Sequence, residues 1–248
     1  MTKVLFKFVE VNVSLTKWRY AMAKTKKQKA LDEELLIECG GYYEDEDKPD
    51  GAYIQVDDYF FNINKIKRLI ASGADVEAKN KNGETPLDLA VYGNNIALAK
   101  LLIASGADLD AKRKYGVRPL HRALDMNNTE VAKLLIASGA DLDAKGKDGF
   151  TPLHLAIYWN KIDLAKLLID SGAKVNVKRK DGFTPLHLAV QRDNIELAKL
   201  LIEAGAKVNV KNKDGRTPLF FSVLCNNITI AKLLISAGAD DDIYSLFG

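Results

Sequence analysis

The chain has 248 residues, of which 47% are hydrophobic and 28% charged, a composition typical of a protein that folds around an apolar core. No run approaches the roughly 18 uninterrupted apolar residues of a membrane-spanning helix, so such a helix is not expected. The formal net charge of +3 is too small to indicate a nucleic-acid partner by itself. The two cysteines, Cys39 and Cys225, match no metal-ligand, redox or disulfide framework, which favours a reducing intracellular compartment such as the cytoplasm.

Residues 1–49 are predicted to form an N-terminal extension with a short strand and an amphipathic, charged helix. Val4, Phe6 and Phe8 alternate along the chain as in a short strand. Residues 15–39 carry apolar side chains on one helical face and end at two glycines, which predicts a helix. Lys7 and Glu10 interrupt the apolar run near the start, so a secretion signal is not expected.

Charge is segregated along this extension, because a basic stretch at 17–29 precedes an acidic stretch at 32–47. A basic amphipathic segment at 15–31 could bind a membrane surface or a calmodulin-like groove. We favour a helix that docks on the following segment with its basic face in solvent. Apart from residues 15–31, no contact with a membrane is expected.

The remainder of the chain repeats with a period of 33 residues. Five of the six prolines and all three histidines keep this spacing, as do five glycines. A repeated structural unit explains such spacing, whereas unrelated functional roles would not place every histidine on one period. The periodic prolines are Pro86, Pro119, Pro152, Pro185 and Pro218, and the histidines are His121, His154 and His187.

The period defines five units, 82–114, 115–147, 148–180, 181–213 and 214–246. Residues 50–81 are interpreted as a degenerate N-terminal capping repeat, because Lys65 and Arg68 replace apolar residues as an exposed end requires. The last unit is expected to act as the C-terminal cap. Since one 33-residue helix pair cannot bury its apolar face alone, several units must stack.

Each unit is predicted to contain two short helices. Thr151 is expected as the N-cap of the first helix, with Pro152 at the first helical position, where its missing N–H costs nothing. Asparagines such as Asn127 suit the left-handed turn between the two helices. Gly205 is expected to end the second helix at 195–202 as a left-handed cap, and Asp-Gly pairs predict tight turns in the links between units.

The hexapeptides at 151–156 and 184–189, both Thr-Pro-Leu-His-Leu-Ala, match the ankyrin signature, with weaker copies at 85–90, 118–123 and 217–222. The chain therefore resembles the ankyrin-repeat family over roughly residues 57–246. The resemblance implies an all-α solenoid of stacked helix–turn–helix units with projecting hairpin loops and a concave surface that binds proteins. It also implies a non-catalytic scaffold or effector without a cofactor, which a symbiont or pathogen could deliver into a host cell.

The three histidines invite a catalytic or metal-binding interpretation. Residues one repeat apart are expected to lie roughly 8–10 Å apart, whereas zinc ligands must converge within about 2 Å of one point. In the family this histidine is structural and bonds near the threonine of the motif. We therefore expect no catalytic residue and no metal ligand.

Residues at the hairpins and at the end of each first helix vary while the repeat frame stays constant. Aromatic residues, Met and Arg are enriched in protein interfaces, so these positions are predicted to bind a partner protein on the concave face. The alternative for Phe150 and Phe183 is ordinary partial burial between repeats. The predicted partner-binding residues are Tyr92, Tyr115, Val117, Met126, Phe150, Tyr158, Trp159, Phe183 and Arg192.

Lysines also recur with the same period at the hairpins. They are predicted to steer a partner by charge, although a solvated edge that keeps the array soluble is the plainer interpretation. The alternative function is nucleic-acid binding along these lysines. No small-molecule substrate is expected. The predicted steering residues are Lys112, Lys114, Lys145, Lys147, Lys178 and Lys180.

Overall fold

The computed structural model describes residue 22 and residues 25–40, 62–113 and 116–240. The strand expected near residue 6, the first half of the repeat at 50–81, and both Lys114 and Tyr115 lie outside these residues. The chain divides into two compact units, one of residues 1–93 and 97–107 and one of residues 94–96 and 108–248. Among the described residues, no helix is long and apolar enough to cross a membrane.

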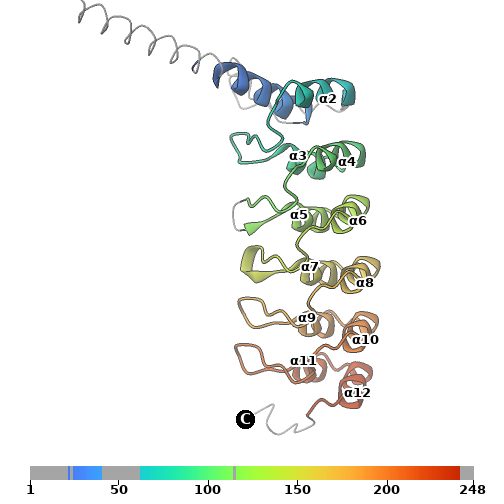
Figure 1. The fold of residues 1–248 in the computed structure, drawn as a ribbon. Helices are drawn as coiled ribbons and strands as arrows, with labels where there is room; N and C mark the ends of the chain where they lie inside the picture. The colour runs from blue at the N-terminus through green and yellow to red at the C-terminus, as the bar shows by residue number, and fades with distance from the viewer. Residues whose placement is uncertain (1–21, 23–24, 41–61, 114–115, 241–248) are drawn as a thin grey trace, which may run out of the picture. The chain divides into compact units, whose positions relative to one another are not determined.

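The first unit consists of short helices (Figure 1). A helix at 25–38 lies beside α2, Ile63–Ala71, and is followed in the chain by α3, Pro86–Tyr92, and α4, Ile96–Ala104. Helix α2 falls in the second half of the degenerate repeat at 50–81. Leu35, Leu36 and Cys39 of the N-terminal segment are buried, whereas its lysines are exposed. This segment therefore contributes to the core of its unit.

Polar side chains hold the N-terminal helix to α2 and to the turn that follows α2. Lys65 Nζ lies 3.0 Å from Glu34 Oε1 and 2.6 Å from Glu38 Oε1. Gln28 Nε2 donates to the carbonyl of Gly73 at 2.7 Å, and the N–H of Asp75 donates to Asp32 Oδ1 at 2.7 Å.

The contacts of Gln28 and Asp32 reproduce a contact that a single asparagine makes between later repeats. Asn176 Oδ1 accepts the N–H of Lys207 at 2.8 Å, while its Nδ2 donates to the carbonyl of Gly205 at 3.0 Å. The helix at 25–38 thus satisfies the same two backbone groups that a preceding repeat would satisfy. It covers the start of the described array in place of a further repeat.

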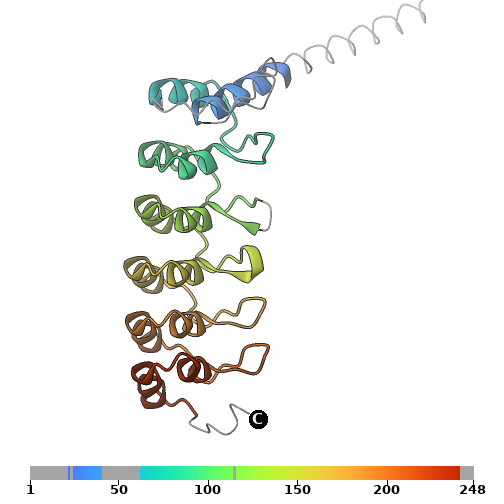
Figure 2. The same cartoon turned by 180° about the vertical axis from the view of Figure 1, so that it is seen from behind.

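The second unit is built from four successive helix pairs in two layers (Figures 1 and 2). The first helices of consecutive pairs contact one another, as do the second helices. The hairpins all project from the side of the first helices (Figure 2). The pairs are α5, Pro119–Asp125, with α6, Thr129–Ala137; α7, Pro152–Tyr158, with α8, Ile162–Asp170; α9, Pro185–Gln191, with α10, Ile195–Glu203; and α11, Pro218–Leu224, with α12, Ile228–Ser236.

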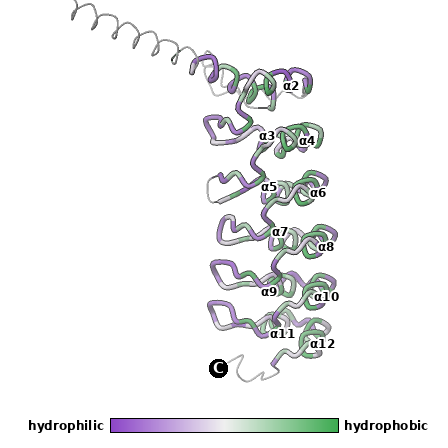
Figure 3. The backbone as a smooth tube through the Cα atoms, in the orientation of Figure 1, coloured by the Kyte–Doolittle hydropathy of each residue, from purple (hydrophilic) through white to green (hydrophobic). Residues whose placement is uncertain are grey.

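The core lies between these helices. The leucine that follows each periodic proline of this unit is almost fully enclosed: Leu120, Leu153, Leu186 and Leu219 are at most 2% exposed. In Figure 3 the helices are mainly hydrophobic and the hairpins mainly hydrophilic. The stacked pairs therefore bury apolar surface that one pair alone would leave in water.

Local sequence signals set the ends of the helices as predicted. Thr151 caps α7 and Pro152 is its first residue. Asn127 adopts a φ of 61° in the turn between α5 and α6, and Gly205 follows α10 with a φ of 85°. These positive φ values are accessible to Asn and Gly at little cost, which explains why those residue types recur there.

The hairpins of neighbouring pairs are joined by backbone hydrogen bonds. The N–H of Lys180 donates to the carbonyl of Asp148 at 2.9 Å, and the N–H of Lys213 donates to the carbonyl of Asp181 at 3.0 Å. A short 3₁₀ turn, η2, Lys147–Gly149, shapes the tip of one hairpin. The side chains at the hairpin bases are therefore carried on linked, not independent, loops.

Candidate partner-binding surface

Two of the three histidines serve as helix caps. Nδ1 of His154 lies 2.8 Å from Oγ1 of Thr151 and accepts the backbone N–H of that threonine at 3.3 Å. His187 makes the same pair of contacts with Thr184, at 2.8 and 3.2 Å. Burial lowers the pKa of His154 to about 3, so this imidazole is neutral at pH 7. The structural role expected for these histidines agrees with their contacts.

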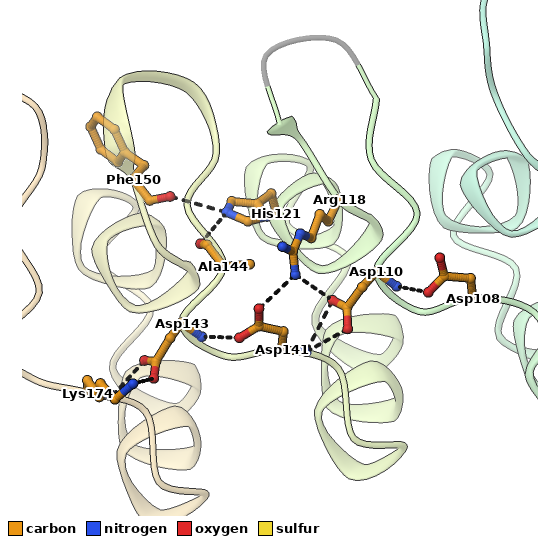
Figure 4. Close-up of polar contacts among 9 residues, drawn as sticks. All are labelled: Asp108, Asp110, Arg118, His121, Asp141, Asp143, Ala144, Phe150 and Lys174. Atoms are coloured by element: carbon orange, nitrogen blue, oxygen red, sulfur yellow. Dashed lines mark hydrogen bonds and ion pairs between the residues drawn. The ribbon is translucent and has the colours of Figure 1, made fainter.

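The repeat at 115–147 departs from this arrangement (Figure 4). Arg118 stands in place of the capping threonine, and its Nη1 lies 3.2 Å from Asp110 Oδ1 and 2.8 Å from Asp141 Oδ2. Nε2 of His121 lies 3.0 Å from the carbonyl oxygen of Ala144. Burial lowers the pKa of His121 as well, although the neighbouring carbonyls oppose that effect. The lost cap is replaced by an ion pair that joins two repeats.

The aspartates of the loops bond to backbone groups (Figure 4). Asp110 accepts the N–H of Asp141, and Asp143 accepts the N–H of Lys174 at 2.8 Å. Across residues 22, 25–40, 62–113 and 116–240, no three His, Cys, Asp or Glu side chains are grouped so that they could hold a metal ion. These polar groups tie repeats together.

Aromatic side chains gather at the end of α7. Trp159 is 46% exposed and its Nε1 donates to Asp125 Oδ1, one repeat earlier, at 3.1 Å. Its ring meets the ring of Tyr158 edge-on at 5.0 Å, and Tyr158 is itself 37% exposed. Arg192, one repeat later, places Cζ 4.0 Å from the centre of the Tyr158 ring. The two aromatic rings are thus fixed by side chains from both neighbouring repeats.

The cluster continues towards the hairpins. The ring of Phe150 lies 6.1 Å from that of Tyr158. Cζ of Arg179 lies 4.1 Å from the centre of the Phe150 ring and 5.5 Å from that of Phe183. Arg179 Nη2 also lies 2.5 Å from Asp181 Oδ2. A guanidinium group therefore sits between two aromatic rings from successive repeats, with its charge compensated.

A last group of rings extends the cluster into the repeat at 214–246. The rings of Phe183 and Phe221 are 5.1 Å apart, and those of Phe221 and Phe220 are 5.5 Å apart. Cζ of Arg216 lies 5.0 Å from the centre of the Phe220 ring. We call this connected series the aromatic–arginine track. It comprises Trp159, Tyr158, Arg192, Phe150, Arg179, Phe183, Phe221, Phe220 and Arg216.

The track contains five of the nine predicted partner-binding residues. The other four are placed differently: Tyr92, 44% exposed, belongs to the first unit, Met126, 39% exposed, ends α5, Val117 is half-buried in its hairpin, and Tyr115 lies outside the described residues. The five on the track are Phe150, Tyr158, Trp159, Phe183 and Arg192.

Four residues of the track were not among those predicted to bind a partner, namely Arg179, Arg216, Phe220 and Phe221. Arg216 occupies the periodic position of Phe150 and Phe183, and that equivalence was the available signal. The sequence alone does not show that a guanidinium group packs on an aromatic ring of a neighbouring repeat.

The hairpin lysines have partners inside the array. Nζ of Lys145 donates to the carbonyl of Lys178 at 3.2 Å, and Nζ of Lys178 donates to the carbonyl of Lys211 at 3.1 Å. Nζ of Lys180 lies 3.6 Å from Asp148 Oδ1. Lys112 and Lys147 are exposed. Some of the periodic lysines thus link consecutive hairpins. Steering of a partner by these lysines stays a prediction.

Stacked helix pairs with projecting, hydrogen-bonded hairpins define a helical repeat protein. A family model for ankyrin repeats in three copies matches residues 58–146 and 153–244, which is more than half of the chain. The chain belongs to the ankyrin-repeat family, whose repeats are in general protein–protein interaction modules and in general not catalytic. No curated protein matches the sequence.

Proposed function

We propose that this chain is a non-catalytic protein-binding module, a scaffold or effector that holds a partner protein against first helices and hairpins centred on residues 115–213. The observation that carries the proposal is the aromatic–arginine track, which connects three repeats; Trp159, Arg192 and Arg216 are exposed on it, whereas Phe221 is buried. Tryptophan, tyrosine and arginine dominate binding energy in protein interfaces. The proposed binding residues are those predicted from the sequence that lie on the track, together with Arg179 and Arg216.

Trp159 is the proposed anchor of the interface. About half of its side chain is exposed, so contact area remains for a partner. Its indole N–H is already bonded to Asp125 and its ring already packs on Tyr158, so the side chain is held before the partner arrives. A pre-organised side chain loses less conformational entropy on binding, which raises affinity.

The thiols support placing this module in a reducing compartment. Cys39 and Cys225 are both free, one buried and one exposed. Burial, helped by the neighbouring Glu38 charge, raises the pKa of the Cys39 thiol to about 12, which makes it unreactive at neutral pH. Neither thiol contributes to the proposed binding surface.

The test is affinity capture from a cell lysate with the full chain and with Trp159→Ala, followed by titration calorimetry with each purified candidate. A true partner is retained by the full chain and loses at least about 2 kcal/mol of binding free energy with the variant. Ile235→Ala is the matched control, because Ile235 is 45% exposed but lies on α12, in the layer of second helices.

The control separates loss of a contact from loss of the fold. Removing the bond to Asp125 should cost only about 1 kcal/mol of folding stability. Captured proteins that bind Trp159→Ala as tightly as the parent, or that are lost equally with Ile235→Ala, would contradict the proposed surface.

A further inference from the structure

The charges on the track are not all compensated inside the protein. Arg179 has Asp181 as its ion-pair partner. Arg192 and Arg216 each stack on an aromatic ring, and neither forms an ion pair with a carboxylate in the part of the chain that the structure describes. The track therefore presents two guanidinium groups whose orientation is fixed but whose hydrogen-bonding donors lack an anionic partner.

Several carboxylates near these arginines accept hydrogen bonds within the protein, among them Asp214, two residues before Arg216, which accepts one from Asn212 Nδ2 at 3.5 Å. Asp193 Oδ1 accepts a hydrogen bond from Asn227 Nδ2, and Asp181 accepts both Arg179 and the N–H of Phe183. In the first hairpin, Asp148 pairs with a lysine. Hydrogen bonds from neutral donors leave the charges of Asp193 and of Asp125, which accepts the indole N–H of Trp159, unchanged, so the sign of the surface depends on the hairpins.

The last two hairpins give this surface its positive surplus. Residues 176–183 hold three basic side chains and one acidic side chain, and residues 209–216 hold the same numbers. Lys211 and Lys213 are exposed in the second of these hairpins. Such a surface attracts polyanions in general, including acidic polypeptides and nucleic acids.

The arrangement of the rings decides between these two classes of partner. Single-stranded nucleic acids bind by stacking their bases on exposed aromatic faces. Here guanidinium groups lie over Phe150, Tyr158 and Phe220, at 4.1, 4.0 and 5.0 Å from the ring centres. One face of each of these rings is therefore covered, which leaves Trp159 as the exposed ring of the track without a guanidinium group over it. One such ring offers little for a run of stacked bases, whereas it suits a single apolar side chain. The arginine forks can then bind the carboxylates on either side of that side chain.

We propose that the partner binds the track through an acidic polypeptide segment in which Asp or Glu side chains flank a large apolar residue. The carboxylates bind Arg192 and Arg216, and the apolar side chain packs on the exposed part of Trp159. This assignment rests on the proposed protein-binding function and specifies the chemistry of the partner.

The test is selection of a random peptide display library against the immobilised full chain, with single-stranded oligothymidylate binding measured in parallel. Selected peptides should be enriched in Asp and Glu around an aromatic or large aliphatic residue. The affinity of a selected peptide should fall at least about tenfold with Arg192→Gln and again with Arg216→Gln. Lys199→Gln is the matched control, since Lys199 is an exposed cation on α10 and should leave affinity unchanged.

Enrichment of neutral or basic peptides would overturn the acidic segment while leaving the protein-binding function intact. Failure to select any peptide would also overturn it, and the capture experiment with Trp159→Ala would then still decide the broader function. Tight oligothymidylate binding that Arg192→Gln weakens, without any peptide binding, would replace both proposals with nucleic-acid binding.

Discussion

Neighbouring hairpins of the track pack closely at Gly182, where an added methyl group has no room. Gly182 has a φ of 84°, and a Cβ built there would lie 2.8 Å from the backbone nitrogen of Lys213. Gly182→Ala therefore adds left-handed strain of about 1–2 kcal/mol and a backbone clash of about 1–3 kcal/mol. Reduced entropy of the unfolded chain returns about 0.4–1 kcal/mol, which leaves a net loss of about 2–4 kcal/mol.

Gly215 is the matched control, because it holds the same position one repeat later. Its φ is 77°, and a Cβ built there would meet no atom within 4 Å. Gly215→Ala thus carries only the left-handed strain, a net loss of about 1 kcal/mol. The expected difference between the two variants is about 1–3 kcal/mol.

Urea unfolding followed by circular dichroism measures this difference as a shift in midpoint at constant slope. Because repeat arrays can open locally, amide exchange at Lys213 supplies a second readout. That amide donates to the carbonyl of Asp181 at 3.0 Å and should lose protection in Gly182→Ala only. Equal destabilisation by the two alanines would refute the argument that close packing of the hairpins, beyond backbone conformation, requires glycine at residue 182.

Two further predictions concern buried and shared charges. The folded-state pKa of His154, about 3, lies below the unfolded value of about 6.5. The stability that the neutral imidazole contributes is therefore complete above pH 6.5 and is lost as pH falls. Between about pH 6.5 and 4.5, the free energy of unfolding should therefore fall by about 2–3 kcal/mol more in the parent chain than in His154→Gln. The glutamine keeps a polar side chain at the capping position. Partial burial raises the pKa of Asp141, but the hydrogen bond from the Asp143 N–H and the Arg118 guanidinium group together hold that pKa below its usual value. NMR titration of Arg118→Ala should show a higher pKa for Asp141.

The helices were predictable because their boundaries depend on neighbouring residues. A threonine followed by proline both caps a helix and starts it, and asparagine or glycine accepts the left-handed turn that ends it. The second helix predicted at 195–202 is α10, which runs one residue further, to Glu203. Arg118 is the exception, because the cap is lost there and the replacing side chain acts through Asp110 and Asp141.

Contacts between repeats were not predictable in the same way. A period of 33 residues shows which residues are equivalent, but it does not show where their side chains point. The sequence predicted a row of lysines along the hairpins but not that Lys145 and Lys178, although exposed, each bond to a carbonyl of the next hairpin. That outcome depends on the distance between hairpins, which only the stacked structure defines.

Trp159 shows how variation within a constant frame can have a structural cause. In two later turns an asparagine side chain bonds across to the preceding repeat, Asn194 to Asn160 and Asn227 to Asp193. Lys161 stands at the equivalent asparagine position of the repeat at 148–180, and the indole of Trp159 makes the bond to Asp125 instead. The tryptophan therefore replaces a missing link between repeats as well as exposing a ring.

This double role limits how a partner can use the anchor. A partner that pulled the indole away from Asp125 would break the bond that this side chain makes between two repeats, and part of the binding energy would be lost in doing so. A partner that packs on the exposed part of the ring leaves the bond intact and gains from a side chain already in place. The second mode costs less, so the bound and free forms of the track should share the same arrangement of Trp159, Tyr158 and Arg192.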